Sequence, residues 1–288
     1  MEFDFLKSPW HEEFFNLLRQ VRSNLIISSP YIGLVPCKKI IDIYNDYKLI
    51  GDISILIVTD LSKNTLLSGA TDPNAICCLA ENFRKIEIRF LPSIHAKIYV
   101  ADDKLAIITS SNMTNAGLYR NFEYGIKIND SNMENIIKND LIEYALLGTK
   151  IEYNKLQFLS RISSELNSIR DKAERSIKRE LYKEFETKLN NFDDEIIRLR
   201  AAGRTPHAIF ADAILYFLKQ RPMTTAELQP MIQKVHSDFC DDSMDRIIDG
   251  RHFGKKWKHA VRTAQQHLKR KGIIEFKDGI WRLSNKNY

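Results

Sequence analysis

Residues 95–123 read HAKIYVADDKLAIITSSNMTNAGLYRNFE and decide the fold of the N-terminal part of this 288-residue chain. Their polar residues follow the pattern H-x-K-x4-D-x6-T-S-x-N, with N-x-E further on. The pattern comprises His95, Lys97, Asp102, Thr109, Ser110, Asn112, Asn121 and Glu123. A lone His-x-Lys on a strand is common and carries little information. Five further matches at fixed offsets make coincidence a poor explanation.

The alternation of polar and apolar residues predicts strands over residues 95–100 and 105–109, joined by the polar turn Asp102–Lys104. On a strand, His95 and Lys97 share one face, while Ala96 and Ile98 point into the core. A hairpin of the two strands brings residues 110–112 back beside the histidine. A phosphate in that place meets a cation, a hydroxyl and an amide.

This pattern resembles the HKD signature of the phospholipase D superfamily, which cleaves phosphodiesters through a histidine nucleophile and without a metal or cofactor. The resemblance implies that His95 attacks phosphorus and that Lys97, Ser110 and Asn112 bind the phosphoryl oxygens. Glu123 would orient the imidazole of the nucleophile. Asp102 would hold the turn and its neighbouring backbone. Thr109 stands where glycine is common in the family.

The resemblance extends upstream in a looser form. Strands are expected over residues 24–31 and 52–60, and helices over residues 37–47 and 72–83. Strands that alternate with helices predict an α/β fold. We therefore expect a phospholipase D-like layered α/β nuclease domain in residues 1–150.

The chain carries one such motif, because the pattern H-x-K-x4-D occurs nowhere else in the sequence. Members with two motifs build one site from both, with one histidine attacking and the other protonating the leaving oxygen. One acid–base group cannot easily serve both steps. We expect a homodimer in which His95 of each subunit faces the other across a two-fold axis.

We expect a cytoplasmic protein that makes no membrane contact. No apolar run approaches the length of a membrane span, and the first residues lack a basic region followed by an apolar stretch. The four cysteines show no C-x-x-C spacing, which favours free thiols over disulfides or zinc. The net charge of +6 is uneven: residues 1–150 carry −2, residues 151–200 carry +1 and residues 201–288 carry +7. A basic excess confined to one domain favours a polyanion-binding module.

Residues 151–202 are predicted to form a long helical linker. No glycine or proline interrupts residues 156–199, and their apolar residues recur at the period of a straight α-helix. One long helix, or two with a slight break, satisfies this pattern. The stripe either packs within the chain, which is the more common case, or forms a strut in a dimer.

Residues 203–288 are predicted to form a winged-helix domain. Three helices are expected first: one over residues 206–220, one that starts at Thr224 and one over residues 255–271. The side chain of Thr224 forms a capping box with Glu227. A hairpin of residues 273–276 and 280–283 follows the helices. The run from residue 261 to residue 284 also resembles the winged-helix modules of Mrr-like restriction nucleases. Trp257, Val261, Ala264 and Leu268 form the buried stripe of the third helix. The residues expected to contact double-stranded DNA are Lys255, Lys256, Lys258, Arg262, Gln265, Gln266, Lys269 and Arg270.

A phosphodiesterase domain joined to a groove-binding module predicts a metal-independent DNA endonuclease of restriction type, and dependence on DNA modification stays open. Two alternatives stay open. A lipid-cleaving phospholipase explains the motif but gives the basic domain no role. A DNA-binding regulator with an inactive nuclease fold explains the basic domain but not an intact motif.

Overall fold

The computed structural model describes residues 3–46, 53–175, 179–248 and 250–284. The chain divides into two compact units, Met1–Ile196 and Ile197–Tyr288, and each is described by itself. A separate linker over residues 151–202 stays a prediction. Tyr47 and Asp52, at the ends of a predicted helix and a predicted strand, lie outside the described residues, as do residues 176–178 of the predicted long helix.

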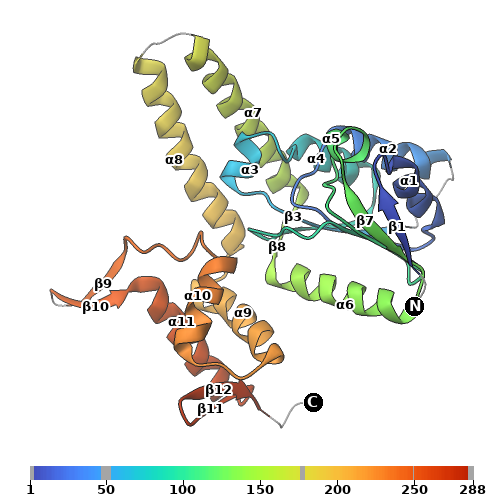
Figure 1. Cartoon of the computed structure of the whole chain (residues 1–288). Coiled ribbons are helices and arrows are strands. Elements are labelled where there is room, and N and C mark those ends of the chain that lie inside the picture. The colour runs from blue at the N-terminus through green and yellow to red at the C-terminus, as the bar shows by residue number, and fades with distance from the viewer. Residues whose placement is uncertain (1–2, 47–52, 176–178, 249, 285–288) are drawn as a thin grey trace. The chain divides into compact units, whose positions relative to one another are not determined.

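An eight-stranded mixed sheet forms the centre of the N-terminal unit (Figure 1). Across the sheet its strands are β1 (Phe3–Lys7), β7 (Tyr124–Ile128), β6 (Leu105–Thr109), β5 (Ile98–Ala101), β2 (Asn24–Ser28), β3 (Ser54–Thr59), β4 (Lys85–Phe90) and β8 (Thr149–Lys150). β2, β3 and β4 are parallel, and all other neighbouring pairs are antiparallel. The predicted α/β class is confirmed.

Helices cover both faces of this sheet (Figure 1). α6 (Ser131–Leu147) lies on one face, over an apolar cluster of Ile26, Val100, Ala106, Ile128, Ile137 and Leu141. The other face carries α1 (His11–Gln20), α2 (Leu34–Asp46), α3 (Lys63–Leu67), α4 (Pro73–Asn82) and α5 (Asn115–Tyr119). There Tyr99 of β5 packs against Trp10 and Phe14, with ring centroids 5.6 and 5.2 Å away. Each fully buried aromatic side chain contributes about 1.5–3 kcal/mol to stability.

β5 and β6 form the predicted hairpin, but β5 begins at Ile98 and not at His95. The predicted start of this strand is wrong, because its pairing with the neighbouring strand β2 ends early. The β2–β5 ladder ends at the pair Ser28–Ile98, and Pro30 further along has no N–H to continue it. The hydroxyl of Ser28 donates to the carbonyl of Ala96 instead, at 3.1 Å. His95 therefore lies in an extended loop beyond the strand.

The predicted long helix is two helices, α7 (Tyr153–Arg175) and α8 (Arg179–Ala201). They run in opposite directions (Figure 1), and Lys188 Nζ of α8 lies 3.8 Å from Glu165 Oε2 of α7. The break between them is thus a reversal of the chain, not the slight break expected. α7 is bound to α3, because Ser163 and Arg170 donate to the carbonyls of residues 66 and 67 at 3.3 and 2.7 Å. Packing within the chain, the more common alternative, accounts for this helix.

The C-terminal unit contains the predicted helices and hairpin in the predicted order. They are α9 (Pro206–Gln220), α10 (Thr225–Val235), α11 (Lys256–Arg270) and the hairpin β11 (Ile274–Lys277) with β12 (Ile280–Leu283). Thr224 and Glu227 form the predicted capping box. A second hairpin, β9 (Asp245–Ile248) with β10 (Arg251–Lys255), stands before α11. No prediction from the sequence covers that hairpin.

No described helix is long and apolar enough to cross a membrane.

Candidate active site

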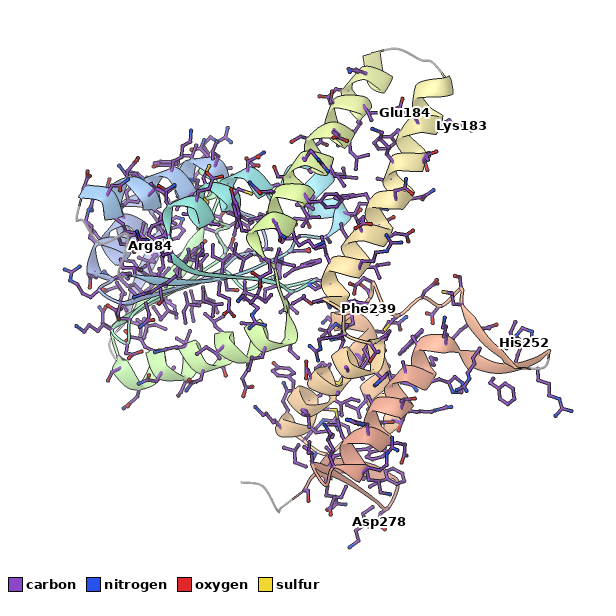
Figure 2. The ribbon with its side chains drawn as sticks, turned by 180° about the vertical axis from the view of Figure 1, so that it is seen from behind. Arg84, Lys183, Glu184, Phe239, His252 and Asp278 are labelled. Atoms are coloured by element: carbon purple, nitrogen blue, oxygen red, sulfur yellow. The ribbon has the colours of Figure 1, made fainter. Side chains whose placement is uncertain are left out.

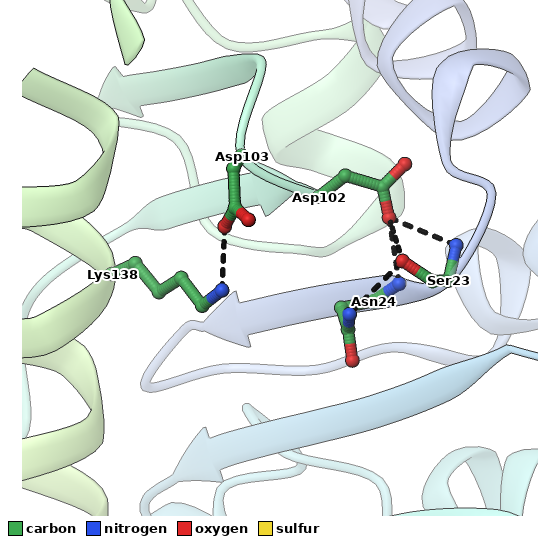
Figure 3. Close-up of polar contacts among 5 residues, drawn as sticks. All are labelled: Ser23, Asn24, Asp102, Asp103 and Lys138. Carbon is green, nitrogen blue, oxygen red and sulfur yellow. Dashed lines mark hydrogen bonds and ion pairs between the residues drawn. The ribbon is translucent and has the colours of Figure 1, made fainter. Parts of the chain in front are cut away.

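Asp102 has the structural role predicted for it. Its backbone lies at a φ of 52°, a left-handed conformation that aspartate tolerates. Its carboxylate accepts hydrogen bonds from the backbone N–H groups of Ser23 and Asn24 at 2.9 and 2.7 Å and from the Ser23 hydroxyl at 2.8 Å (Figure 3). It also accepts the backbone N–H of Arg22 at 2.7 Å. Burial raises the pKa of this carboxyl, but these hydrogen bonds outweigh it and hold the pKa below its ordinary value. Asp102 thereby fixes the turn after β5 to the start of β2.

His95 and Lys97 lie at the other end of β5, at its N-terminus. The side chain of His95 is exposed, and among the described residues it makes no hydrogen bond. Lys97 is only 7% exposed, and its Nζ donates to the carbonyl of His95 at 2.9 Å. Burial lowers the pKa of the Lys97 ammonium, and the Glu123 carboxylate raises it by less. Side chains on one strand face would be equally exposed to solvent. His95 is exposed and Lys97 is buried, so the two residues do not share such a face.

Ser110, Asn121 and Glu123 form one hydrogen-bonded group. The Ser110 hydroxyl donates to Oε2 of Glu123, and Asn121 Nδ2 donates to Oε1 at 3.0 Å. The Ser110 hydroxyl also accepts the backbone N–H of Tyr124 at 3.1 Å. Ser110 directly follows β6 and Glu123 directly precedes β7, so the pairing of these two strands holds the arrangement. A carboxylate fixed at both oxygens is a preorganised acceptor.

The role of Glu123 in orienting the His95 imidazole stays a prediction. Among the described residues no hydrogen bond joins these side chains, and the Glu123 oxygens accept from Ser110 and Asn121. The Coulombic effect of Glu123 on Lys97 places the carboxylate near the ammonium. The chain therefore brings Lys97, Ser110 and Glu123 into one neighbourhood.

Asn112 keeps an unused acceptor at this site. Its side-chain oxygen is buried and has no hydrogen-bond partner among the described residues. Its backbone carbonyl accepts from the N–H of Thr114 at 2.8 Å and from the Ser111 hydroxyl at 3.2 Å. Buried polar atoms without a partner are uncommon and often mark a place that a ligand completes.

Sequence reasoning missed four residues that hold the site. The Ser8 hydroxyl accepts the backbone N–H of Glu123 at 2.6 Å, and the Ser29 hydroxyl accepts that of Met113 at 3.0 Å. Trp10 Nε1 donates to the carbonyl of Gly117 at 3.1 Å. A Cβ on that glycine would lie 2.3 Å from the carbonyl oxygen of residue 112, so only glycine fits. The sequence shows a glycine at position 117, but it does not show that this residue packs against the carbonyl of residue 112.

The predicted DNA-contact residues lie in the C-terminal unit, on and just before α11. Arg262, Gln266, Lys269 and Arg270 are exposed, and their spacing of three and four residues places them on one face of the helix. Lys256 is also exposed, whereas Lys255 and Lys258 are half-buried. Lys255 pairs with Asp245 at 2.9 Å, and Lys258 Nζ lies 5.4 Å from the ring centroid of Trp257. The predicted buried stripe of this helix is confirmed.

Gln265 does not belong to this exposed face, so its predicted outward position is wrong. The residue is 1% exposed. Its Nε2 donates to the hydroxyl of Thr225 at 3.1 Å, which joins α11 to α10. Helical periodicity could not separate residues 265 and 266, because both are glutamine and both lie beside the apolar stripe.

Known proteins support this description of the N-terminal part. The family model described as "Cardiolipin synthase, PLD-like domain" matches residues 14–143. This part of the chain is therefore similar to PLD-like domains. It includes the His95 motif and the strands that carry it. A search of the curated proteins found no significant match.

Solved structures show the same likeness at low identity. Nuc from Salmonella typhimurium, a phospholipase D family member, is 16% identical over 52% of this chain and 98% of its own, with a TM-score of 0.43. NucT from Helicobacter pylori is 14% identical over 52% and 100%, with a TM-score of 0.38. Phosphatidylserine synthase from Haemophilus influenzae Rd KW20 is 15% identical over 60% and 45%, with a TM-score of 0.47. These differing names leave the substrate of the present chain to be argued from its own residues.

Proposed function

We propose that this protein is a metal-independent endonuclease of restriction type, which cleaves double-stranded DNA in a homodimer. The observation that carries the proposal is the exposed imidazole of His95, whose backbone carbonyl accepts from the Lys97 ammonium, in a region similar to PLD-like domains whose chain continues into a basic helical unit. A neutral imidazole at the surface is a nucleophile in the range of neutral pH. A lysine beside it supplies positive charge for a phosphate without a metal ion.

The reaction has two displacements. In the first, a ring nitrogen of His95 bonds to phosphorus, the bond from phosphorus to the leaving sugar oxygen breaks, and that oxygen takes a proton from His95 of the partner subunit. In the second, water attacks phosphorus, the nitrogen–phosphorus bond breaks, and the water proton passes to the same histidine of the partner subunit. Lys97 and the Asn112 amide bind the phosphoryl oxygens in both steps.

In this proposal Glu123 and Ser110 act together. Within one chain the Glu123 carboxylate accepts from Ser110 and Asn121, and it lies close enough to Lys97 to raise its pKa. The carboxylate offsets part of the lowering of the Lys97 pKa that burial causes. The Ser110 hydroxyl can turn from the carboxylate to a phosphoryl oxygen, because a hydroxyl rotates to suit its partner.

The proposed dimer has a candidate contact surface beside this site. The aromatic surface, defined as Phe3, Phe5, Phe122 and Tyr124, is exposed, and Phe122 is 103% exposed. Phe5 lies 5.5 Å from Phe3 and 5.8 Å from Tyr124 between ring centroids. Glu123 stands between two of its members in the sequence. Clustered exposed aromatic residues are typical of protein contacts.

The winged-helix assignment of the C-terminal unit is part of the proposal. The three helices, the β11–β12 hairpin and the bridge between Met223 and Trp281 support it. α11 carries five Lys or Arg residues and no acid. A basic helix with an exposed polar face is suited to the major groove.

One digest tests the activity. Methylated and unmethylated plasmid are incubated with the full chain in excess EDTA, together with His95→Ala and the control His207→Ala, which alters a histidine outside the motif. We expect discrete cleavage by the parent and the control, and binding without cleavage by His95→Ala. Strict dependence on added magnesium would contradict the mechanism, and release of a lipid headgroup without DNA cleavage would favour the phospholipase.

Subunit mixing tests the shared site. When parent and His95→Ala chains are unfolded together in equal amounts and refolded, only about one quarter of the dimers carry two intact histidines. Activity per chain pair should fall to that quarter of the parent value. A fall to one half would show that each chain works alone.

A further inference from the structure

The β9–β10 hairpin of the C-terminal unit is the feature that the proposed function leaves unexplained. Its strands pair Ile248 with Arg251 and Ile247 with His252, and the register then shifts before the pair of Asp245 with Lys255. All described side chains of residues 245–254 are exposed. Figure 2 shows His252 at the protruding end of this hairpin. The hairpin therefore adds nothing to the core of its own unit.

Polar contacts fix this hairpin to the first turns of α11. The backbone N–H of Lys256 donates to the carbonyl of Met244 at 2.9 Å. The ring of His259 bridges both strands, because Nε2 lies 2.5 Å from the carbonyl of Phe253 and Nδ1 lies 3.2 Å from Arg246. A two-stranded hairpin by itself is marginally stable. These contacts hold it in a defined position relative to the helix.

The exposed surface of the hairpin combines apolar and cationic side chains. Ile247 and Phe253 are 56% and 47% exposed. Arg251 and Lys256 are exposed and make no ion pair or side-chain hydrogen bond among the described residues. Residues 244–258 contain five Lys or Arg and two Asp, and Asp245 is already paired with Lys255 at 2.9 Å.

This composition identifies the class of partner. An apolar protein surface would bury the unpaired cations, which costs several kcal/mol per ion in effective terms. Duplex DNA satisfies both kinds of side chain, since its phosphates bind arginine and lysine while its sugars and base edges accept apolar groups. The charge of the hairpin is also continuous with that of the exposed face of α11.

The direct connection of the β9–β10 hairpin to α11 determines which part of a DNA duplex the hairpin can contact. β10 leads directly into α11, and β11 begins four residues after α11 ends, so the two hairpins stand at opposite ends of the helix. A helix of 15 residues is about 22 Å long. That length exceeds the width of the major groove, about 12 Å. When the helix lies in a groove, both hairpins reach the DNA beyond it.

We infer that the β9–β10 hairpin is a second DNA-binding element, which binds the phosphate backbone and minor groove of duplex DNA beside the segment that α11 contacts. The inference rests on the proposed binding of DNA by this unit, but not on cleavage. Arg251 contacts phosphate, and Phe253 lies against the sugar edge of the minor groove. The hairpin lengthens the bound segment and adds affinity without reading its central bases.

Duplex length separates this contact from that of α11. The full chain with His95→Ala, which leaves the DNA intact under the proposed mechanism, is titrated with duplexes of two lengths, one helical turn and about twice that. Arg251→Ala and Phe253→Ala are compared with Arg84→Ala, which removes an exposed arginine of the N-terminal unit (Figure 2). Each hairpin variant should bind the long duplex about tenfold more weakly, and the salt slope should fall by about one for Arg251→Ala. Binding to the short duplex and of the control should stay within about twofold.

Every other outcome has a defined meaning. Unchanged binding of the long duplex by both hairpin variants, while Arg262→Ala weakens it, would overturn the hairpin contact and leave the α11 contact intact. A change in sedimentation without a change in affinity would overturn it in favour of self-association. A parent chain that binds no duplex would overturn both the hairpin contact and the proposed function. A parent that binds but does not cleave would overturn the nuclease alone, and the hairpin result would still stand. Unchanged melting, followed through Trp257, confirms that each variant is folded.

Discussion

Replacement of Asp102 by asparagine should weaken the N-terminal unit without removing its chemistry. The carboxylate accepts four hydrogen bonds, three of them on Oδ1 and one on Oδ2. An amide oxygen can keep the three on one side, but the amide nitrogen then faces the N–H of Arg22, a donor against a donor. One bond is lost and three become neutral, at about half their former strength.

The expected loss of unfolding free energy is about 2 kcal/mol. A hydrogen bond to a charged group contributes about 1.5–3 kcal/mol when buried, so one lost bond and three weakened bonds sum to about 4 kcal/mol at the lower end. Solvent screening of this partly exposed carboxylate reduces the sum by about half. Asparagine accepts the left-handed φ of 52°, so no backbone strain adds to this value. Asp103→Asn is the matched control, because it breaks one surface ion pair with Lys138 at 2.5 Å (Figure 3) and should cost less than about 1 kcal/mol.

Hydrogen exchange of the amides in residues 24–28 and 98–101, followed with increasing urea, measures unfolding of this unit alone. The difference between parent and Asp102→Asn should also depend on pH. The folded pKa of Asp102 lies below its ordinary value of 3.8, so its stabilisation is present above that value and is lost as pH falls through the lower, folded pKa. Equal stability of parent and variant at pH 7, or complete loss of activity in a folded variant, would refute the structural role.

Three further changes test other parts of the structure. Glu134 is fully buried, and among the described residues neither of its carboxyl oxygens has a hydrogen-bond partner; burial, and then the nearby acidic residues, raises its pKa to about 7. Glu134→Gln should therefore stabilise the unit by about 2 kcal/mol at pH 8 and by little at pH 5. Urea unfolding at both pH values measures this gain, and an equal gain at both would contradict the raised pKa. Asp238 accepts from the buried guanidinium of Arg200 at 2.7 Å; Asp238→Ala should cost the C-terminal unit about 3 kcal/mol in tryptophan-monitored unfolding, and a loss below 1 kcal/mol would contradict the pairing. Gly117→Ala places a Cβ against the carbonyl of Asn112; it should lower the melting temperature by several degrees and the activity with it, and full activity would mean that the loop can shift without cost.

The sequence was sufficient where the signal was local or carried by a spaced motif. The role of Asp102, the β5–β6 hairpin, the capping box at Thr224 and the buried stripe of α11 follow from periodicity, from turn and cap chemistry or from the motif, and the structure has all of them. The first core strand and the α/β class follow from the alternation of strands with helices. These features need no knowledge of distant contacts.

What the sequence could not supply depends on contacts between distant segments. The start of β5 depends on Pro30, which follows the neighbouring strand β2, and the burial of Gln265 depends on Thr225 in another helix. The reversal between α7 and α8 leaves the apolar period unchanged, so a periodic pattern cannot reveal it. The strands of the β9–β10 hairpin read DRII and RHFGK, and neither alternates apolar and polar residues, so periodicity does not separate them from a polar loop. At the site, Ser8 and Ser29 act through backbone groups that no motif identifies.

The most direct test of the central claim is detection of the bond between His95 and DNA. The full chain is mixed with a labelled duplex in excess EDTA and stopped in alkaline detergent, and the protein is digested and analysed by mass spectrometry. The proposed mechanism predicts a nucleotide attached through phosphorus to His95, absent from His95→Ala and present in His207→Ala. Cleavage with no adduct on His95, or with an adduct on another residue, would contradict it.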